Sequence, residues 1–428
     1  MFDQCKALII GLQKRGAVVG SSLNTAYLLE RLSQTLERLE TLMAIFVSNR
    51  YLPRRILLLT GCFARAAAER HSISRLWKQS SGLMARSVTQ NAGDHGEHYI
   101  TRDKKEYWAM FYSAAGGGVL IALMALFKTY LGSIIDDKVW KGIAEGLNYG
   151  LGFMVIFMLH FTVATKQPAM TAARFAEAVE KTPQGKTVNV KLAQLLVDVF
   201  RSQSIAVLGN VLIAMGLAAL IAFGYQYKTG EPLMNADQIA YQLHSIDPFA
   251  GTLWFAAIAG VWLFCSGIIS GYFDNRSNYL NMRMRLTQHP LLKKLMSEKT
   301  RVKFANYMHE NYGSLIGNLC FGMLLGITGV VGYLTHLPLD IRHVAFSSAN
   351  VGYIAVSGHF TYSLLLQCIA FVLLIGLVNL IVSFSLTLWV ALRSLNAEID
   401  SWWPIWHEVC QIVKKRPLSL FLPIQLDK

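Results

Sequence analysis

Three residues of one short connection carry the clearest chemical potential in this chain. Asp340, Arg342 and His343 lie within four positions of one another, in the mostly apolar stretch 337–350. A carboxylate, a guanidinium and an imidazole this close together can form an ion pair that fixes a loop, or they can bind a polar ligand. The sequence leaves both interpretations open.

Four further polar residues lie in or beside long apolar stretches. Lys166 directly follows one such stretch, and Asn210, Asn318 and Asn379 lie inside three others. A polar group in a bilayer is costly unless it is paired or used. The asparagines therefore either stabilise helix contacts or line a path for a substrate, and Lys166 is either an interfacial anchor or part of a site.

The segment 274–310 is strongly basic and contains the aromatic residues Tyr279, Phe304 and Tyr307. Basic residues beside a span stay on the cytoplasmic side and attract anionic lipid head groups. Aromatic residues among such charges are also typical of a nucleic-acid surface, although we favour lipid as the partner. The candidate contact residues for lipid or nucleic acid are Arg276, Arg283, Arg285, Lys293 and Lys294.

No catalytic constellation emerges from the sequence. It contains no GxxxxGK[ST] loop for phosphate, no GxGxxG after a strand and no GxSxG elbow. The six cysteines form no CxxC pair, and the spacing of His95 and His98 matches no standard metal site. We therefore expect no cofactor and no metal, and enzymatic activity stays undecided.

The elements that position these residues are long apolar helices. A bilayer needs about 20 apolar helical residues per span, and only a helix or a closed barrel satisfies the backbone there. Six stretches of at least 20 residues have no Asp, Glu, Lys or Arg, and 53% of the chain is apolar. We expect an all-α integral membrane protein with six spans, at 107–127, 146–163, 204–225, 252–272, 314–334 and 364–388.

Charge alternates along the connections between these spans. The segments 166–201 and 274–310 hold 6 and 8 Lys or Arg residues, whereas 128–145 and 228–247 hold 3 and 1. Basic connections stay on the cytoplasmic side. The alternation predicts a topology with both termini in the cytoplasm, and it accounts for most of the net charge of +14.

The predicted organisation has three parts. Residues 1–105 form a helical cytoplasmic domain, residues 106–392 form the membrane domain, and residues 393–428 form a cytoplasmic or interfacial tail. An apolar stripe from Leu28 to Phe46 predicts a helix that packs within a bundle. A second helical stretch is expected from Pro53 to Arg86.

The third and fifth spans resemble each other. Gly209-Asn210 is followed by Met215 and Gly224-Tyr225, and Gly317-Asn318 is followed by Met323 and Gly332-Tyr333 at the same offsets. Both spans leave the cytoplasmic side under the predicted topology. This internal sequence similarity predicts three tandem helical hairpins in parallel repetition.

Several separated motifs carry a family resemblance. They are Gly96–Arg102, Ala114–Gly117, Ala164–Met170, Gly317-Asn318 and Leu337–Asn350. On these motifs the chain resembles, over about residues 10–415, the bacterial family of site-specific recombinase transmembrane proteins, named after a gonococcal recombinase-like member. The resemblance implies placement in a bacterial inner membrane and a link to DNA recombination. The His-x-x-Arg element of tyrosine recombinases is absent, and so is the strand-and-helix alternation of the serine type.

Three classes of function stay open at this point. The family name implies a DNA-recombination role, which would be that of a membrane-associated accessory because no catalytic residue transfers to this chain. A transporter or lipid-handling protein is the first alternative, and a polar cavity reaching Asn210 and Asn318 would favour it. A non-catalytic membrane scaffold is the second alternative, which a fully packed helix bundle would favour.

Overall fold

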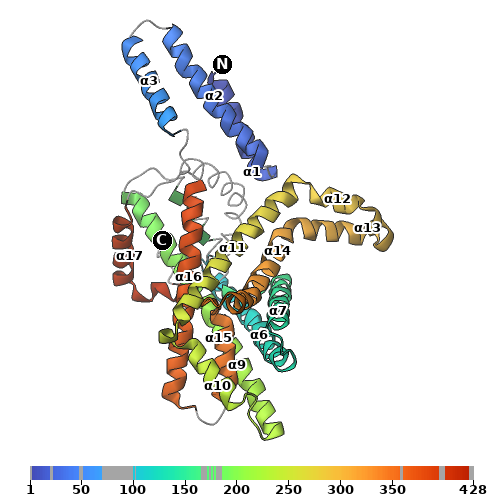
Figure 1. The fold of residues 1–428 in the computed structure, drawn as a ribbon. Coiled ribbons are helices and arrows are strands. Elements are labelled where there is room, and N and C mark those ends of the chain that lie inside the picture. Colours follow the sequence, from blue (N-terminus) through green and yellow to red (C-terminus); the bar gives the residue numbers. More distant parts are fainter. Residues whose placement is uncertain are drawn as a thin grey trace. The chain divides into compact units, whose positions relative to one another are not determined.

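The structure is a computed structural model of the chain. It describes residues 2–19, 23–47, 52–69, 100–101, 103–164, 171–172, 175–176, 178–179, 186–356, 360–394 and 401–423. These residues form α-helices and short 3-10 turns, and no strand occurs among them (Figure 1). The chain divides into two compact units, one of residues 1–91, 271–312 and 393–395, the other of residues 92–270, 313–392 and 396–428. The expected all-α class is therefore confirmed for the described part.

The first unit contains α1 (Phe2–Val19), α2 (Leu23–Val47) and α3 (Leu52–Glu69). α1 packs along α2, and Lys6 forms an ion pair with Glu40 across them. The helix expected from the Leu28–Phe46 stripe is confirmed as α2. Leu28 and Leu32 are nonetheless exposed, so α1 and α3 leave this side of α2 uncovered.

The same unit includes two short helices, α12 (Met282–Gln288) and α13 (Pro290–Leu295), within the basic segment. Asn281 has a positive φ of 48° and turns the chain ahead of α12. Pro290 opens α13, where a missing backbone N–H costs nothing. This part of the basic segment therefore consists of two short helices and not of an irregular loop.

The second unit contains the long apolar helices. With the shorter helices beside them, they are α6 (Lys104–Ile134), α7 (Lys138–Met158), α9 (Lys186–Thr229), α10 (Ala236–Ile246), α11 (Thr252–Tyr279), α14 (Glu298–Thr335), α15 (Val344–Ala355), α16 (Tyr362–Ser394) and α17 (Trp403–Lys415). Residues 271–279 of α11, 298–312 of α14 and 393–394 of α16 belong to the first unit. Within the described residues, α6, α9, α11, α14 and α16 are long and apolar enough to cross a membrane. The protein is therefore a helical membrane protein.

Two stretches differ from the expected span layout. The span expected at 146–163 is not one helix, because α7 ends at Met158 and His160 turns the chain with a φ of 58°. α7 also begins with charged residues and is not among the five spanning candidates. The apolar stretch after Arg342 holds two helices, and Val344–Asn350, expected as loop, forms the start of α15.

α7 and α14 cross closely and run in opposite directions. Gly146 faces Gly326, and Gly150 faces Gly322. A Cβ on Gly322 would lie 2.0 Å from the Gly150 nitrogen, and one on Gly326 would lie 2.3 Å from the Gly146 Cα. Glycine is therefore required at this crossing, as in other close contacts between membrane helices.

α6 and α9 run in the same direction, as do α11 and α16. In the first pair Gly118 lies against Asn210 and Ala214, and in the second pair Gly260 lies against Asn379 and Val382. α7 returns along α6, and α14 returns along α11. The unit therefore holds two similar helix sets, α6–α7–α9 and α11–α14–α16. The antiparallel α7–α14 crossing shows that the two sets point in opposite directions. α6, α9 and α14, which hold the first, third and fifth expected spans, run in the same direction, as the expected repetition of hairpins requires, and the hairpin layout itself stays a prediction.

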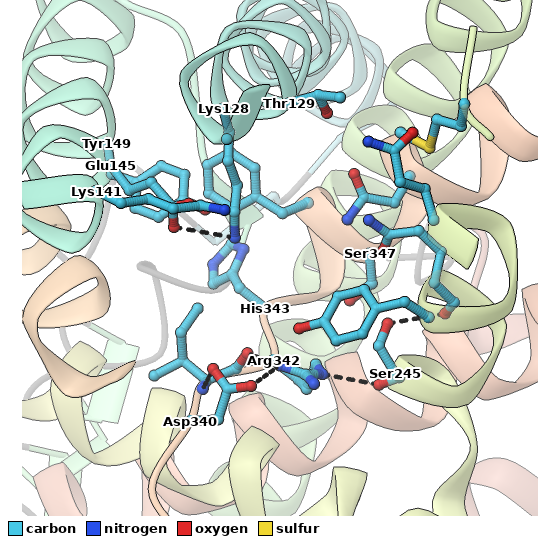
Figure 2. Close-up of a pocket in the computed structure, with 18 of the residues that line it drawn as sticks. Lys128, Thr129, Lys141, Glu145, Tyr149, Ser245, Asp340, Arg342, His343 and Ser347 are labelled. Carbon is cyan, nitrogen blue, oxygen red and sulfur yellow. Dashed lines mark hydrogen bonds and ion pairs between the residues drawn. The ribbon is translucent and has the colours of Figure 1, made fainter. Parts of the chain in front are cut away.

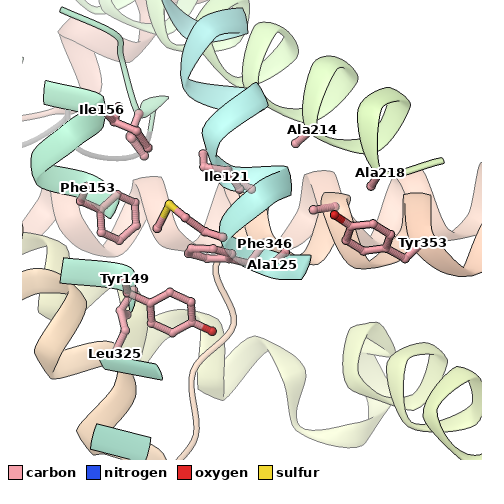
Figure 3. Close-up of a cluster of buried hydrophobic side chains, with 14 of the residues drawn as sticks. Ile121, Ala125, Tyr149, Phe153, Ile156, Ala214, Ala218, Leu325, Phe346 and Tyr353 are labelled. Atoms are coloured by element: carbon pink, nitrogen blue, oxygen red, sulfur yellow. The ribbon is translucent and has the colours of Figure 1, made fainter. Parts of the chain in front are cut away.

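A buried cluster joins these sets around α15 (Figure 3). Tyr149 and Phe346 lie with their ring centroids 4.5 Å apart, and Phe153 packs on Phe321 at 5.0 Å. The Tyr353 hydroxyl donates a 2.7 Å hydrogen bond to the Ala122 carbonyl. α15 is buried on nearly all its residues, because α9, α6 and α10 surround it.

Candidate functional site

A polar pocket of about 480 Å³ lies at one end of the second unit (Figure 2). Its walls come from the end of α6, the start of α7, α10, the 340–343 connection and the first turns of α15. The volume lies within the range of about 300–1,000 Å³ that is typical of small-molecule sites. Asp340, Arg342 and His343, singled out from the sequence, all line this pocket.

Arg342 fixes the connection on which it lies. Its Nη1 donates to the Asp340 carboxylate at 2.6 Å and to the Ile341 carbonyl at 2.8 Å. Its Nε donates to the Ser245 carbonyl at the end of α10, also at 2.8 Å. The ion pair expected from the sequence is present and belongs to the pocket wall, so the two interpretations of this loop are compatible.

His343 has a different environment from its neighbours. It precedes the first residue of α15, is 1% exposed, and lies among the rings of Phe153, Phe321 and Phe346. Burial lowers the pKa of its imidazole to about 4, since the charged form loses hydration. His343 is therefore neutral at physiological pH.

A second ion pair crosses the opposite wall of the pocket. The Lys128 ammonium on α6 lies 3.4 Å from the Glu145 carboxylate on α7. Lys141 and Tyr149 of α7 line the same wall (Figure 2). The sequence reasoning missed these residues. Their signal was available, since Lys128 and Glu145 are the charged residues that bound two charge-free stretches on either side of a short turn.

Asn210 of α9 clamps the chain just after α7. Its Oδ1 accepts a hydrogen bond from the Ala164 N–H at 2.9 Å, and its Nδ2 donates to the Thr162 carbonyl at 2.9 Å. The same Nδ2 donates to the Ala114 carbonyl of α6. The side chain is 1% exposed, and its three hydrogen bonds satisfy backbone groups that a continuous helix would otherwise pair.

Asn379 of α16 forms the matching clamp in the other helix set. Its Oδ1 accepts from the Val344 N–H at 3.2 Å, and its Nδ2 donates to the Arg342 carbonyl at 3.0 Å and the Ala256 carbonyl at 2.7 Å. Arg342 and Val344 flank His343, so this clamp positions the pocket loop. Neither asparagine lines the pocket itself.

The remaining candidates are placed elsewhere. Asn318 donates to the Ser314 carbonyl of its own helix and does not line the pocket, and Lys166 lies outside the described residues. The exposed residues Arg276, Arg283, Arg285, Lys293 and Lys294 belong to the first unit. Among the described residues no group of His, Cys, Asp or Glu could hold a metal ion, while His95 and His98 lie outside them.

The fold and the pocket together define a polytopic, all-helical membrane protein with a polar ligand-sized cavity. A family model described as Site-specific recombinase matches residues 1–423, so the chain belongs to this family. Comparisons with curated proteins and with solved structures give no match. The family resemblance expected from the sequence motifs is confirmed.

Proposed function

We propose that this protein transports a small polar solute across the bacterial cytoplasmic membrane, with the 480 Å³ pocket as its binding site. One observation carries the proposal: Asn210 and Asn379 make equivalent hydrogen bonds in two helix sets of opposite direction. Oppositely oriented repeats with interrupted helices beside a binding site are the architecture of many secondary transporters.

The break before α15 supports the same function. Non-helical backbone buried among membrane helices needs protein partners for its polar groups or a water-filled cavity beside it. The 340–343 connection meets both conditions, because Asn379 satisfies its backbone and the pocket lies against it. A helix bundle that served only as a scaffold needs neither feature.

The proposed topology adds α7 as a sixth span and keeps both termini in the cytoplasm. The connections 135–137, 230–251 and 336–343 then lie on the outer side. The first joins α6 to α7, which both line the pocket, and the other two contribute lining residues themselves. All three are poor in Lys and Arg, as the charge rule requires. The pocket therefore opens toward the outside in this conformation.

Reconstitution tests the proposal directly. Purified protein in sealed phospholipid vesicles is expected to accelerate uptake of at least one labelled small solute over protein-free vesicles. Gln242→Trp should block uptake by filling the pocket, whereas Ala240→Trp on the exposed side of α10 should not. Absence of uptake for a broad panel of solutes would contradict transport and favour a scaffold or a lipid-handling role.

The family description and the exposed basic segment favour nucleic-acid binding as a second candidate function. Arg283 hydrogen-bonds Asn306, while Arg285, Lys293 and Lys294 are also exposed. Backbone-directed DNA binding weakens steeply with salt. Salt-sensitive binding of a DNA duplex by detergent-solubilised protein, lost in Arg283→Gln/Arg285→Gln, would support this function. Equal binding by the double variant would remove it from this segment.

A further inference from the structure

The charges of the pocket cancel one another. Its basic side chains are those of Lys128, Lys141 and Arg342, and its acidic side chains are those of Glu145, Asp237 and Asp340. His343 adds no charge, because its pKa is lowered by burial. The site therefore presents no net charge to a ligand.

Four of these six charges are also neutralised locally. Lys128 is paired with Glu145 at 3.4 Å, and Arg342 is paired with Asp340 at 2.6 Å. The Arg342 guanidinium is held further by two backbone carbonyls, so it is not available to move toward a ligand. A ligand with one net charge would have to break such a pair or stay uncompensated in a partly desolvated site, and both are costly.

Neutral hydrogen-bonding groups make up much of the remaining wall. They include Thr129, Tyr149, Tyr241, Gln242, Ser347 and Asn350. Hydroxyl and amide groups both donate and accept hydrogen bonds, so they suit a solute with several hydroxyl or amide groups of its own.

We infer that the transported solute is a small polar molecule without net charge, either an uncharged polyol or amide or a zwitterion. The inference rests on the proposed transport function and adds its selectivity. The Lys128–Glu145 pair sets this selectivity, because it neutralises the wall that faces the fixed Arg342–Asp340 pair. Removing one member of the pair changes the charge of the site by one unit.

The test compares four labelled probes in vesicles that contain the protein. Erythritol is uncharged and glycine betaine is a zwitterion, whereas choline and methanesulfonate carry one fixed charge each. We expect uptake of erythritol or glycine betaine above protein-free vesicles, and no such uptake of choline or methanesulfonate. Faster uptake of a charged probe than of both neutral probes would overturn the inference while leaving transport intact. Uptake of none of the four by the wild-type protein would count against transport itself.

Charge variants test the role of the pair. Glu145→Gln leaves Lys128 unpaired and is expected to raise methanesulfonate uptake by about tenfold, the factor that corresponds to about 1.4 kcal/mol. Lys128→Gln should raise choline uptake instead. The exchange Lys128→Glu/Glu145→Lys restores neutrality and should restore the wild-type preference, which separates a charge effect from a folding defect. Unchanged exclusion of both ions in the two single variants would overturn the assigned role of the pair.

Discussion

Asn210 and Asn379 hold the chain in the same way at two places. Each amide accepts a hydrogen bond from one backbone N–H and donates to the carbonyl two residues earlier, at Ala164 and Thr162 or at Val344 and Arg342. Each also donates to a carbonyl of the neighbouring parallel helix. Three backbone groups thus depend on one side chain in each clamp.

Replacing either clamp by alanine is expected to destabilise the protein. Asn379→Ala leaves three buried backbone groups without their partner, which should lower the free energy of unfolding by about 2 kcal/mol. Asn318→Ala is the matched control, because among the described residues that amide donates to the Ser314 carbonyl of its own helix and not to a neighbouring helix. Thermal unfolding in detergent measures both. Equal losses for Asn379→Ala and Asn318→Ala would contradict the clamp.

The α7–α14 crossing predicts a strong dependence on glycine. Gly322→Ala should prevent correct folding, because its Cβ would lie 2.0 Å from the Gly150 nitrogen. Gly329→Ala is the control on the same helix, where a Cβ meets nothing within 4 Å. Alanine there should stabilise the helix by up to about 1 kcal/mol. The yield of monodisperse protein in size-exclusion chromatography distinguishes the two variants. Similar yields would show that α7 and α14 lie further apart than the structure places them.

His343 predicts a pH dependence of stability. Burial lowers its pKa in the folded protein to about 4, from the ordinary value of 6.5 for a histidine in water. The unfolded chain therefore binds the proton more tightly, so this residue makes stability rise as pH increases from about 4 to about 6.5. His343→Gln should reduce that rise in the unfolding temperature. Identical pH profiles for both proteins would show that the imidazole is not buried in neutral form.

We expect that a positive charge alone cannot replace the Arg342 guanidinium in the 340–343 connection. Lysine keeps the positive charge but cannot reach the Ser245 carbonyl and the Asp340 carboxylate in the geometry of a guanidinium. Arg342→Lys should therefore reduce solute uptake several-fold, and Arg342→Gln should reduce it at least as much. Wild-type uptake in Arg342→Lys would show that the fixed loop geometry is dispensable.

Much of the fold can be predicted from the sequence, since charge-free stretches longer than a bilayer leave few alternatives to helices. The Asp340–His343 group could also be recognised, because charged residues in an apolar stretch need a structural or functional reason. His160 and Asn148 visibly interrupt the stretch 146–163, but the break itself could not be predicted, since the apolar pattern continues past the end of α7. Hydropathy does not record where a backbone turns.

The repeat relation was hidden for another reason. The internal sequence similarity pairs Gly209-Asn210 with Gly317-Asn318, whereas the hydrogen bonds make Asn379 the counterpart of Asn210. Oppositely oriented repeats need only matching contacts, such as Ala114 and Ala256 each accepting from an asparagine. Different residue types can make such contacts, so the relation between the two helix sets is visible in the structure and not in the sequence.

The orientation of the two helix sets is the central claim, and side-specific labelling tests it most directly. Single cysteines at His160 and His336, the exposed residues that follow α7 and α14, are introduced into a cysteine-free variant. In intact cells a membrane-impermeant maleimide should label His336→Cys, and it should label His160→Cys only after the membrane is opened. Labelling of both from the same side would contradict the opposed repeats and the transport mechanism built on them.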